Sequence, residues 1–207
     1  MAEQLKKRQQ IGKMGEEDTI RHLEKLRGCK RILCNLYVPV KDGINTTEID
    51  GVMIHEKGIF VIENKNYSGR IYGDEEEFRW LQIQKQGRRK WTKQFYSPVR
   101  QNQAHIRHLK QFLMTEGFSY LEELQVPYLS VITFNDKAKL KRISIWSADI
   151  LVSESRKVKR RLRRKIRWMP RVLARKQIEQ LYEALKVLEN PGKRVRRQHG
   201  KYLDHVG

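Results

Sequence analysis

The stretch TEIDGVMIHEKGIFVIENKNYSG, Thr47 to Gly69, decides the fold expected for this chain. It predicts two neighbouring strands, Glu48–His55 and Ile59–Lys65, joined by the tight connection Glu-Lys-Gly. Both faces of the second strand begin with apolar side chains, so we expect a central strand that is covered on each side. Polar side chains follow only at its end. The hairpin is therefore expected to carry charged groups at the edge of a hydrophobic core.

These charged groups are two carboxylates and an ammonium. Because side chains alternate along a strand, Glu63 and Lys65 are expected on one face, about 6–7 Å apart, with Asp50 of the preceding strand near Glu63. Two carboxylates at the edge of a core repel each other unless a cation joins them. Mg²⁺ typically takes one or two carboxylates together with water and substrate phosphate. The three residues therefore predict a metal site that hydrolyses a phosphodiester.

A purely structural explanation competes with this one. A Glu-x-Lys step at a strand end is common, and an exposed ion pair usually accounts for it. The addition of Asp50 on the neighbouring strand is what favours a catalytic site.

The rest of the chain predicts further helices and strands around this hairpin. An N-terminal helix is expected over residues 2–27, and a second helix begins at Ser97-Pro98, an N-cap followed by the proline of a first turn, with Leu109 and Leu113 among its inward side chains. Two more helices, separated by Pro170, are expected after Arg156, the first with an apolar face of Val158, Leu162, Ile166 and Met169 and the second over Arg171–Glu189. The other strands are predicted at Arg31–Val38, Tyr67–Tyr72, Phe78–Gln84, Pro127–Phe134 and Asp149–Ser153. This order predicts an α/β fold with a central mixed β-sheet flanked by helices.

The charge is concentrated at the C-terminal end. The chain of 207 residues carries 44 Lys and Arg against 24 Asp and Glu, a net charge of +20. Residues 1–155 hold 26 basic and 20 acidic residues, and residues 156–207 hold 18 and 4, so the net charges are +6 and +14. We therefore expect a core at 1–155, a basic helical extension and tail at 156–207, and a polyanionic partner. Nucleic acid is favoured over an anionic membrane surface.

Two basic segments supply candidate nucleic-acid-binding residues. The run from Arg156 to Lys176 has 12 positive and no negative residues among 21, whereas ordinary surfaces mix the two signs. The segment Lys85–Lys93 places Trp91 among basic residues. It is expected to be either a loop that stacks a base or a solvated, charged hairpin with a core tryptophan. The candidates are Arg88, Arg89, Lys90, Trp91, Lys93, Arg160, Arg161, Arg163, Arg164 and Lys165.

Other features of the sequence point to a cytoplasmic protein. No stretch has the ~18 apolar residues of a membrane span, and the N-terminus lacks the apolar region of a signal peptide. Cys29 and Cys34 match no metal or redox motif, so two buried, reduced thiols are expected.

Four segments in order resemble the nuclease-related domain (NERD) family, a branch of the PD-(D/E)xK nuclease superfamily. They cover roughly half the chain: GKMGEE at Gly12–Glu17, TEIDGVMIHEKGIFVIENKNYSGRIYG at Thr47–Gly73, Trp80, and YSPVRQNQAHIRHL at Tyr96–Leu109. The resemblance implies a restriction-endonuclease-like core.

The resemblance also implies roles for individual residues, and none of the expected residues is missing. It assigns Mg²⁺ or Mn²⁺ to Asp50, Glu63 and the backbone carbonyl of Asn64. Lys65 would be the catalytic base or a charge stabiliser. Glu16 matches a first-helix glutamate that reaches the metal directly or through water. Gln101 matches the glutamine of the helix that faces the site.

The sequence thus predicts a metal-dependent DNA endonuclease whose basic extension grips the phosphate backbone. Two alternatives remain, a non-catalytic nucleic-acid-binding module on a nuclease-like fold and a ribonuclease, since nothing in the sequence distinguishes DNA from RNA. Pure binding would not need carboxylates beside phosphate, which favours the enzyme. We expect no small-molecule cofactor and no membrane partner, and double-strand cutting would favour a homodimer.

Overall fold

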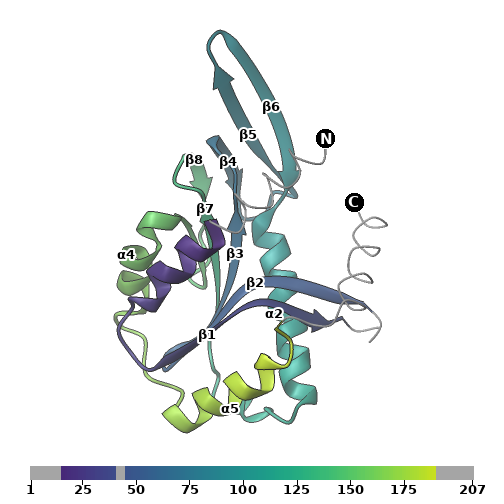
Figure 1. The fold of residues 1–207 in the computed structure, drawn as a ribbon, viewed down its shortest axis with the longest axis vertical. Helices are drawn as coiled ribbons and strands as arrows, with labels where there is room; N and C mark the ends of the chain where they lie inside the picture. Colours follow the sequence, from purple (N-terminus) through teal and green to yellow (C-terminus); the bar gives the residue numbers. More distant parts are fainter. Residues whose placement is uncertain (1–14, 41–44, 190–207) are drawn as a thin grey trace. The chain divides into compact units, whose positions relative to one another are not determined.

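The computed structural model describes residues 15–40 and 45–189 and divides into two compact units (Figure 1). The first unit contains the described parts of 1–27, 63–102 and 130–169. The second contains those of 28–62, 103–129 and 170–207. No helix in the described ranges is long and apolar enough to cross a membrane.

A five-stranded mixed sheet has the order β1-β2-β3-β7-β9. Its strands are β1 (Lys30–Pro39), β2 (Thr46–His55), β3 (Gly58–Lys65), β7 (Tyr128–Phe134) and β9 (Ile150–Glu154). The first three pair antiparallel, whereas β7 and β9 are parallel. β3 is the middle strand and is buried from Gly58 to Glu63. The predicted central strand and the mixed α/β class are therefore confirmed.

The first unit contains a second mixed sheet, in the order β6-β5-β4-β8. Its strands are β4 (Gly69–Asp74), β5 (Arg79–Gln86), β6 (Arg89–Tyr96) and β8 (Ala138–Ser144). β4 and β8 run parallel, and the other two pairings are antiparallel. The sequence did not predict β6 and β8. Most side chains of both strands are exposed, so neither strand shows the apolar alternation by which strands are recognised.

Trp80 is the centre of the hydrophobic core of the first unit. Its ring is fully buried and stacks on Phe134, with ring centroids 6.1 Å apart and an interplanar angle of 7°. Its indole Nε1 donates to the Asp74 carbonyl at 2.9 Å, which fixes the ring against β4. A Cβ at Gly73 would lie 2.3 Å from this ring, so only glycine fits there.

Residues of β1, β2 and β3 form the hydrophobic core of the second unit with α2 (Pro98–Thr115) and α5 (Arg175–Lys186). In Figure 1, α5 lies alongside β1. The short α3 (Tyr120–Glu123), which was not predicted, adds Leu121 to this core. Leu109 and Leu113 of α2 face inward as expected. Cys29 and Cys34 are half-buried rather than buried, and no disulfide joins them.

The remaining helices agree with the predictions in position but not in extent. Residues 15–24 are helical, while the earlier part of the predicted N-terminal helix lies outside the described residues. α4 (Ser155–Ile166) buries Val158, Leu162 and Ile166 of the predicted face, whereas Met169 lies beyond the helix and is half-buried. The segment 171–174 was predicted to be helical and is not, because the Val172 and Leu173 amides donate to the Glu56 carbonyl. The extension contributes α4 to one unit and α5 to the other, and its status as a separate domain stays a prediction.

We expect Gly73→Ala to destabilise the protein by about 2 kcal/mol, because overpacking a rigid, hydrogen-bonded indole forces the backbone to shift. Urea unfolding measures the change. Gly15→Ala is the control, since a Cβ there would lie 3.4 Å from the Asn64 side chain and is expected to be neutral or stabilising. Equal midpoints for both variants would contradict the packing described for Trp80.

Candidate active site

Charged side chains occupy the end of β3, where the strand leaves the core. Lys65 Nζ lies 2.7 Å from Glu63 Oε1, so the two side chains share one face, as their alternation along the strand predicts. The Glu63 side chain is only 3% exposed and that of Lys65 is 18% exposed. A surface ion pair, the structural alternative for this Glu-x-Lys step, would be far more exposed than this.

α2 supplies a second partner for the ammonium group. Gln101, in its first turn, accepts a hydrogen bond from Lys65 Nζ at 2.7 Å. The ammonium is thus fixed between a carboxylate oxygen and an amide oxygen. The structure brings together three predicted site residues, Glu63, Lys65 and Gln101, within the first unit.

Asn64 belongs to a different network, made of buried hydroxyl groups. Its Oδ1 accepts from Thr133 Oγ1 at 3.0 Å, and Thr133 Oγ1 lies 3.3 Å from Thr19 Oγ1. Thr19 Oγ1 is 3.0 Å from Ser155 Oγ, which donates to the Phe134 carbonyl at 3.1 Å. The network joins the end of β3 to the first helix, β7 and the start of α4.

The hydroxyl network was not predicted from the sequence. The side chains in direct contact are 69 to 136 residues apart along the chain, and serine and threonine in helices and strands carry no pattern that pairs them. Figure 1 shows the first helix (purple) beside α4, consistent with the contact between Thr19 and Ser155. The network therefore holds the first helix against the end of β3.

Glu16 follows Gly15 in the first helix. Because Gly15 lies against the Asn64 side chain, the helix approaches the end of β3 at this point. The Glu16 side chain therefore starts close to Asn64, whose backbone carbonyl is a predicted metal ligand. Its predicted role at the metal stays a prediction.

Asp50 lies in β2 and belongs to the second unit. β2 pairs with β3 in a register that includes His55↔Gly58 and Gly51↔Ile62. Asp50 and Glu63 are the next residues of the two strands, and their joint role stays a prediction. Among the described residues, no group of three or more His, Cys, Asp and Glu side chains is placed to hold a metal. A site built from two carboxylates and a backbone carbonyl would not form such a group.

The first candidate nucleic-acid-binding segment is a β-hairpin rather than a loop. Gln84 pairs with Trp91 across β5 and β6, and Trp91 Nε1 donates to Gln84 Oε1 at 2.7 Å. Trp91 is 43% exposed, so the prediction of a core tryptophan is wrong. Arg89 and Lys93 lie on the same strand face as Trp91, and Arg88 and Lys90 are exposed as well.

The second candidate segment, α4, has basic residues in two different situations. Arg160, Arg163 and Arg164 are exposed. Arg161 is exposed as well, but its Nη1 donates to the Val152 carbonyl at 3.0 Å, and the half-buried Lys165 donates through Nζ to the Ile150 carbonyl at 3.1 Å. Burial lowers the pKa of Lys165, and Asp149 offsets part of that effect.

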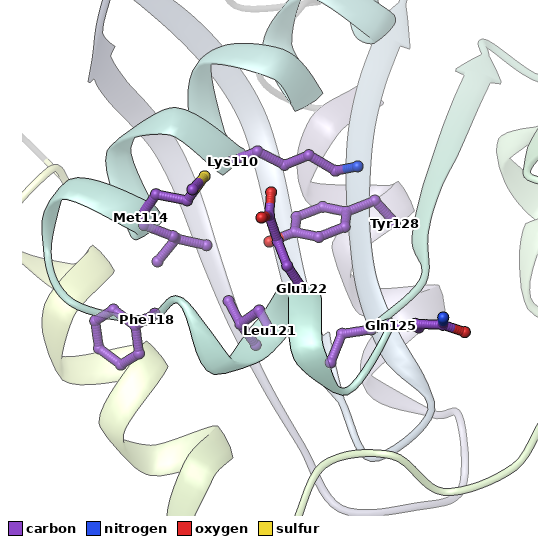
Figure 2. A pocket seen from close by; sticks show the side chains of 9 residues that line it. Lys110, Met114, Phe118, Leu121, Glu122, Gln125 and Tyr128 are labelled. Carbon is purple, nitrogen blue, oxygen red and sulfur yellow. The ribbon is translucent and has the colours of Figure 1, made fainter.

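A hollow in the second unit offers a different chemical environment (Figure 2). It has a volume of about 280 Å³ and lies between α2, α3 and β7, with Lys110, Glu122 and Tyr128 around it. Lys110 Nζ stands 4.7 Å from the centroid of the Tyr128 ring. Burial, and then the nearby Glu122 carboxylate, raise the pKa of Tyr128, so its phenol stays protonated. This hollow thus lacks the buried carboxylate–ammonium pair found at the end of β3.

Comparison with known proteins supports the resemblance seen in the sequence. The family described as nuclease-related domain matches residues 11–135. An uncharacterized protein of Bacillus anthracis is 37% identical over 139 residues, which cover 67% of this chain and 59% of that protein. The chain thus spans less than two thirds of the length of this relative. No solved structure matches the chain.

We expect Lys65→Met to destabilise the protein by about 3 kcal/mol, because it leaves the buried Glu63 carboxylate without its ammonium. Glu63→Gln in the same background should recover most of this loss, since it removes the buried charge. Chemical unfolding of the two single variants and the double variant measures the coupling. Lys137→Met, which removes an exposed lysine of the same unit, is the control. Additive effects of the two changes would exclude an energetically important pair.

Proposed function

The chain belongs to the nuclease-related domain family, and on that premise we propose that it is a metal-dependent nuclease that hydrolyses phosphodiester bonds in DNA. The observation that carries the proposal is the Lys65 ammonium fixed between Glu63 and Gln101 at the end of a buried strand. A buried charge is costly for a fold, so its place at the open end of a strand is better explained by chemistry than by stability.

The oxygen donors at this strand end suit Mg²⁺ or Mn²⁺, which are hard cations. Glu63, Asp50 and the backbone carbonyl of Asn64 would hold the ion, with Glu16 as a further candidate. The β2–β3 register supports the inclusion of Asp50, because Gly51 pairs with Ile62, and Asp50 and Glu63 are the strand neighbours of that pair. When bound, such an ion activates water and neutralises charge that develops on the phosphate.

Lys65 supplies a compact positive charge to the reacting phosphate. Its ammonium is held by Glu63 Oε1 and by the Gln101 amide oxygen at the strand end where the phosphate would bind. A fixed donor stabilises developing negative charge without reorganisation during the reaction. Gln101 positions Lys65, because its amide oxygen holds the ammonium from the α2 side.

Two other functions need separate tests. A nucleic-acid-binding module without catalysis would keep the Glu63–Lys65 pair for structure alone, and a ribonuclease would use the same residues on RNA. The buried carboxylate favours an enzyme over a binding module, since a carboxylate beside phosphate weakens binding unless a cation lies between them.

Double-strand cutting would place two copies of the chain on one duplex. We expect the protein to act in the cytoplasm.

The basic segments would provide affinity for the polyanionic substrate. Exposed cations stand on both, in the β5–β6 hairpin and along α4. Neutralising phosphates with lysine and arginine releases counterions, so we expect binding to weaken steeply with added salt. These contacts would be independent of base sequence.

We expect cleavage of plasmid DNA to require Mg²⁺ or Mn²⁺ and to fall at least about 100-fold in Asp50→Ala, Glu63→Gln and Lys65→Ala. Single-turnover assays measure the rate, and circular dichroism verifies folding. Glu116→Gln, which removes an exposed carboxylate, is the control. Full activity in EDTA, or wild-type rates in Asp50→Ala, would refute the proposal. Parallel RNA substrates separate a nuclease specific for DNA from a ribonuclease.

Glu16→Ala and Gln101→Ala should lower the rate less than the Asp50 change, by about 10- to 100-fold, because neither residue is needed for the minimal metal site and both position water or metal. Rates at saturating metal and DNA provide the measurement. Gln101→Glu, which keeps an oxygen facing Lys65, should retain more activity than Gln101→Ala. Wild-type rates in both alanine variants would remove these side chains from the site.

A further inference from the structure

α4 presents three chemically distinct sides. Val158, Leu162 and Ile166 are buried in the protein, so the apolar side of the helix is already covered. The other positions are almost all basic. Any ligand of α4 must therefore bind through its basic sides.

One basic side is committed to the edge of the five-stranded sheet. β9 is the last strand of that sheet, and Arg161 and Lys165 donate to its Val152 and Ile150 carbonyls. Exposed strand edges invite pairing with other chains, and basic side chains are a common means of covering them. Burial raises the pKa of Glu154, but the hydrogen bond from Lys157 and the charges of Lys157 and Arg161 bring the pKa below its usual value. This side of α4 thus has a structural task.

The third side is an exposed stripe of arginines that ends at a tryptophan. Arg160, Arg164 and Arg167 are spaced four and three residues apart, and Arg163 lies four before Arg167. Trp168, just beyond the helix, is 83% exposed, and the Arg167 Cζ lies 4.8 Å from its ring centroid. Burial in the protein does not account for a tryptophan placed in this way.

We propose that this arginine–tryptophan stripe binds an unpaired nucleic-acid strand, with the arginines on successive phosphates and Trp168 stacked on an unpaired base. This inference deepens the proposed nuclease function, from which it takes nucleic acid as the partner. Arginine alone would suit a duplex equally well. A tryptophan face needs a base that is free to leave its stack, and only an unpaired strand or an opened end offers one.

The covered apolar side argues against a membrane as the ligand. A helix that lies in a membrane interface inserts a whole apolar face. In α4 this face is occupied by the protein core, and among the described residues 155–175 Trp168 is the one exposed large apolar side chain. One tryptophan is sufficient to stack a base but does not provide an inserting face.

The test measures binding of labelled oligothymidylate, oligouridylate and a duplex of equal length, in EDTA so that no strand is cut. We expect Trp168→Ala to weaken single-strand binding by about 5- to 150-fold, the range of base stacking on an aromatic side chain, and duplex binding by less than about threefold. Trp146→Ala is the matched control, because Trp146 is also exposed, at 60%, in the same unit but stands outside α4. It should bind as wild type.

The arginines are tested through the salt dependence of binding. Arg160→Ala with Arg164→Ala should make the single-strand salt slope shallower by about 1.4, at about 0.7 per phosphate. Lys139→Ala with Lys141→Ala removes the same charge from exposed positions of β8, outside both basic segments, and should leave the slope unchanged. Lys165→Met should instead lower the melting temperature, because it uncovers the β9 edge.

Three results would overturn the proposal. The first two are an equal loss of binding affinity in the Trp168 and Trp146 variants, and an equal loss of affinity for duplex and single strand in Trp168→Ala. The third is a tryptophan fluorescence that shifts with phosphatidylserine vesicles and not with oligonucleotide. The binding arms do not depend on cleavage. A Trp168-specific loss in a protein that cuts no DNA would support the stripe and refute the nuclease. Active cleavage with a binding-neutral Trp168→Ala would refute the stripe alone.

Discussion

The rest of the structure depends on the burial of β3, which is covered on both faces until its last residues. Ile59 to Ile62 are enclosed completely, so the strand must be the middle of its sheet. Where this cover ends, Glu63 pairs with Lys65, and Lys65 also donates to Gln101. The cost of an isolated buried charge therefore fixes both the place and the geometry of the candidate site.

Contacts within the protein also divide the basic residues of the chain into two groups. A net charge of +20 indicates a polyanionic partner but does not identify which cations meet it. Arg161 and Lys165 donate to the carbonyls of β9, whereas the exposed Arg160, Arg163 and Arg164 belong to the arginine–tryptophan stripe. Trp91 and Trp168 share this outward situation, and Trp80 does not. Contacts to backbone carbonyls thus separate structural cations from those available to a ligand.

Residues that lie far apart in the sequence hold the site together. Thr19, Thr133 and Ser155 join the first helix, β7 and α4 around Asn64 through short hydroxyl contacts. Neutral hydroxyls in such a network rigidify the scaffold without adding charge beside the carboxylates. The charged pair can therefore remain at the end of β3 while the surrounding elements stay fixed.

The sequence by itself determined the central hairpin, the α2 start at Pro98, the buried face of α4 and the alternation that puts Glu63 and Lys65 on one face, because these follow from local periodicity. Only the tertiary structure decided that Gln101 binds Lys65, that β6 and β8 complete a second sheet, and that residues 171–174 are held by Glu56 instead of a helix. Each of these depends on pairing between distant segments. Such pairing leaves no period in the sequence, because its free energy comes from the partner strand or side chain rather than from local preference.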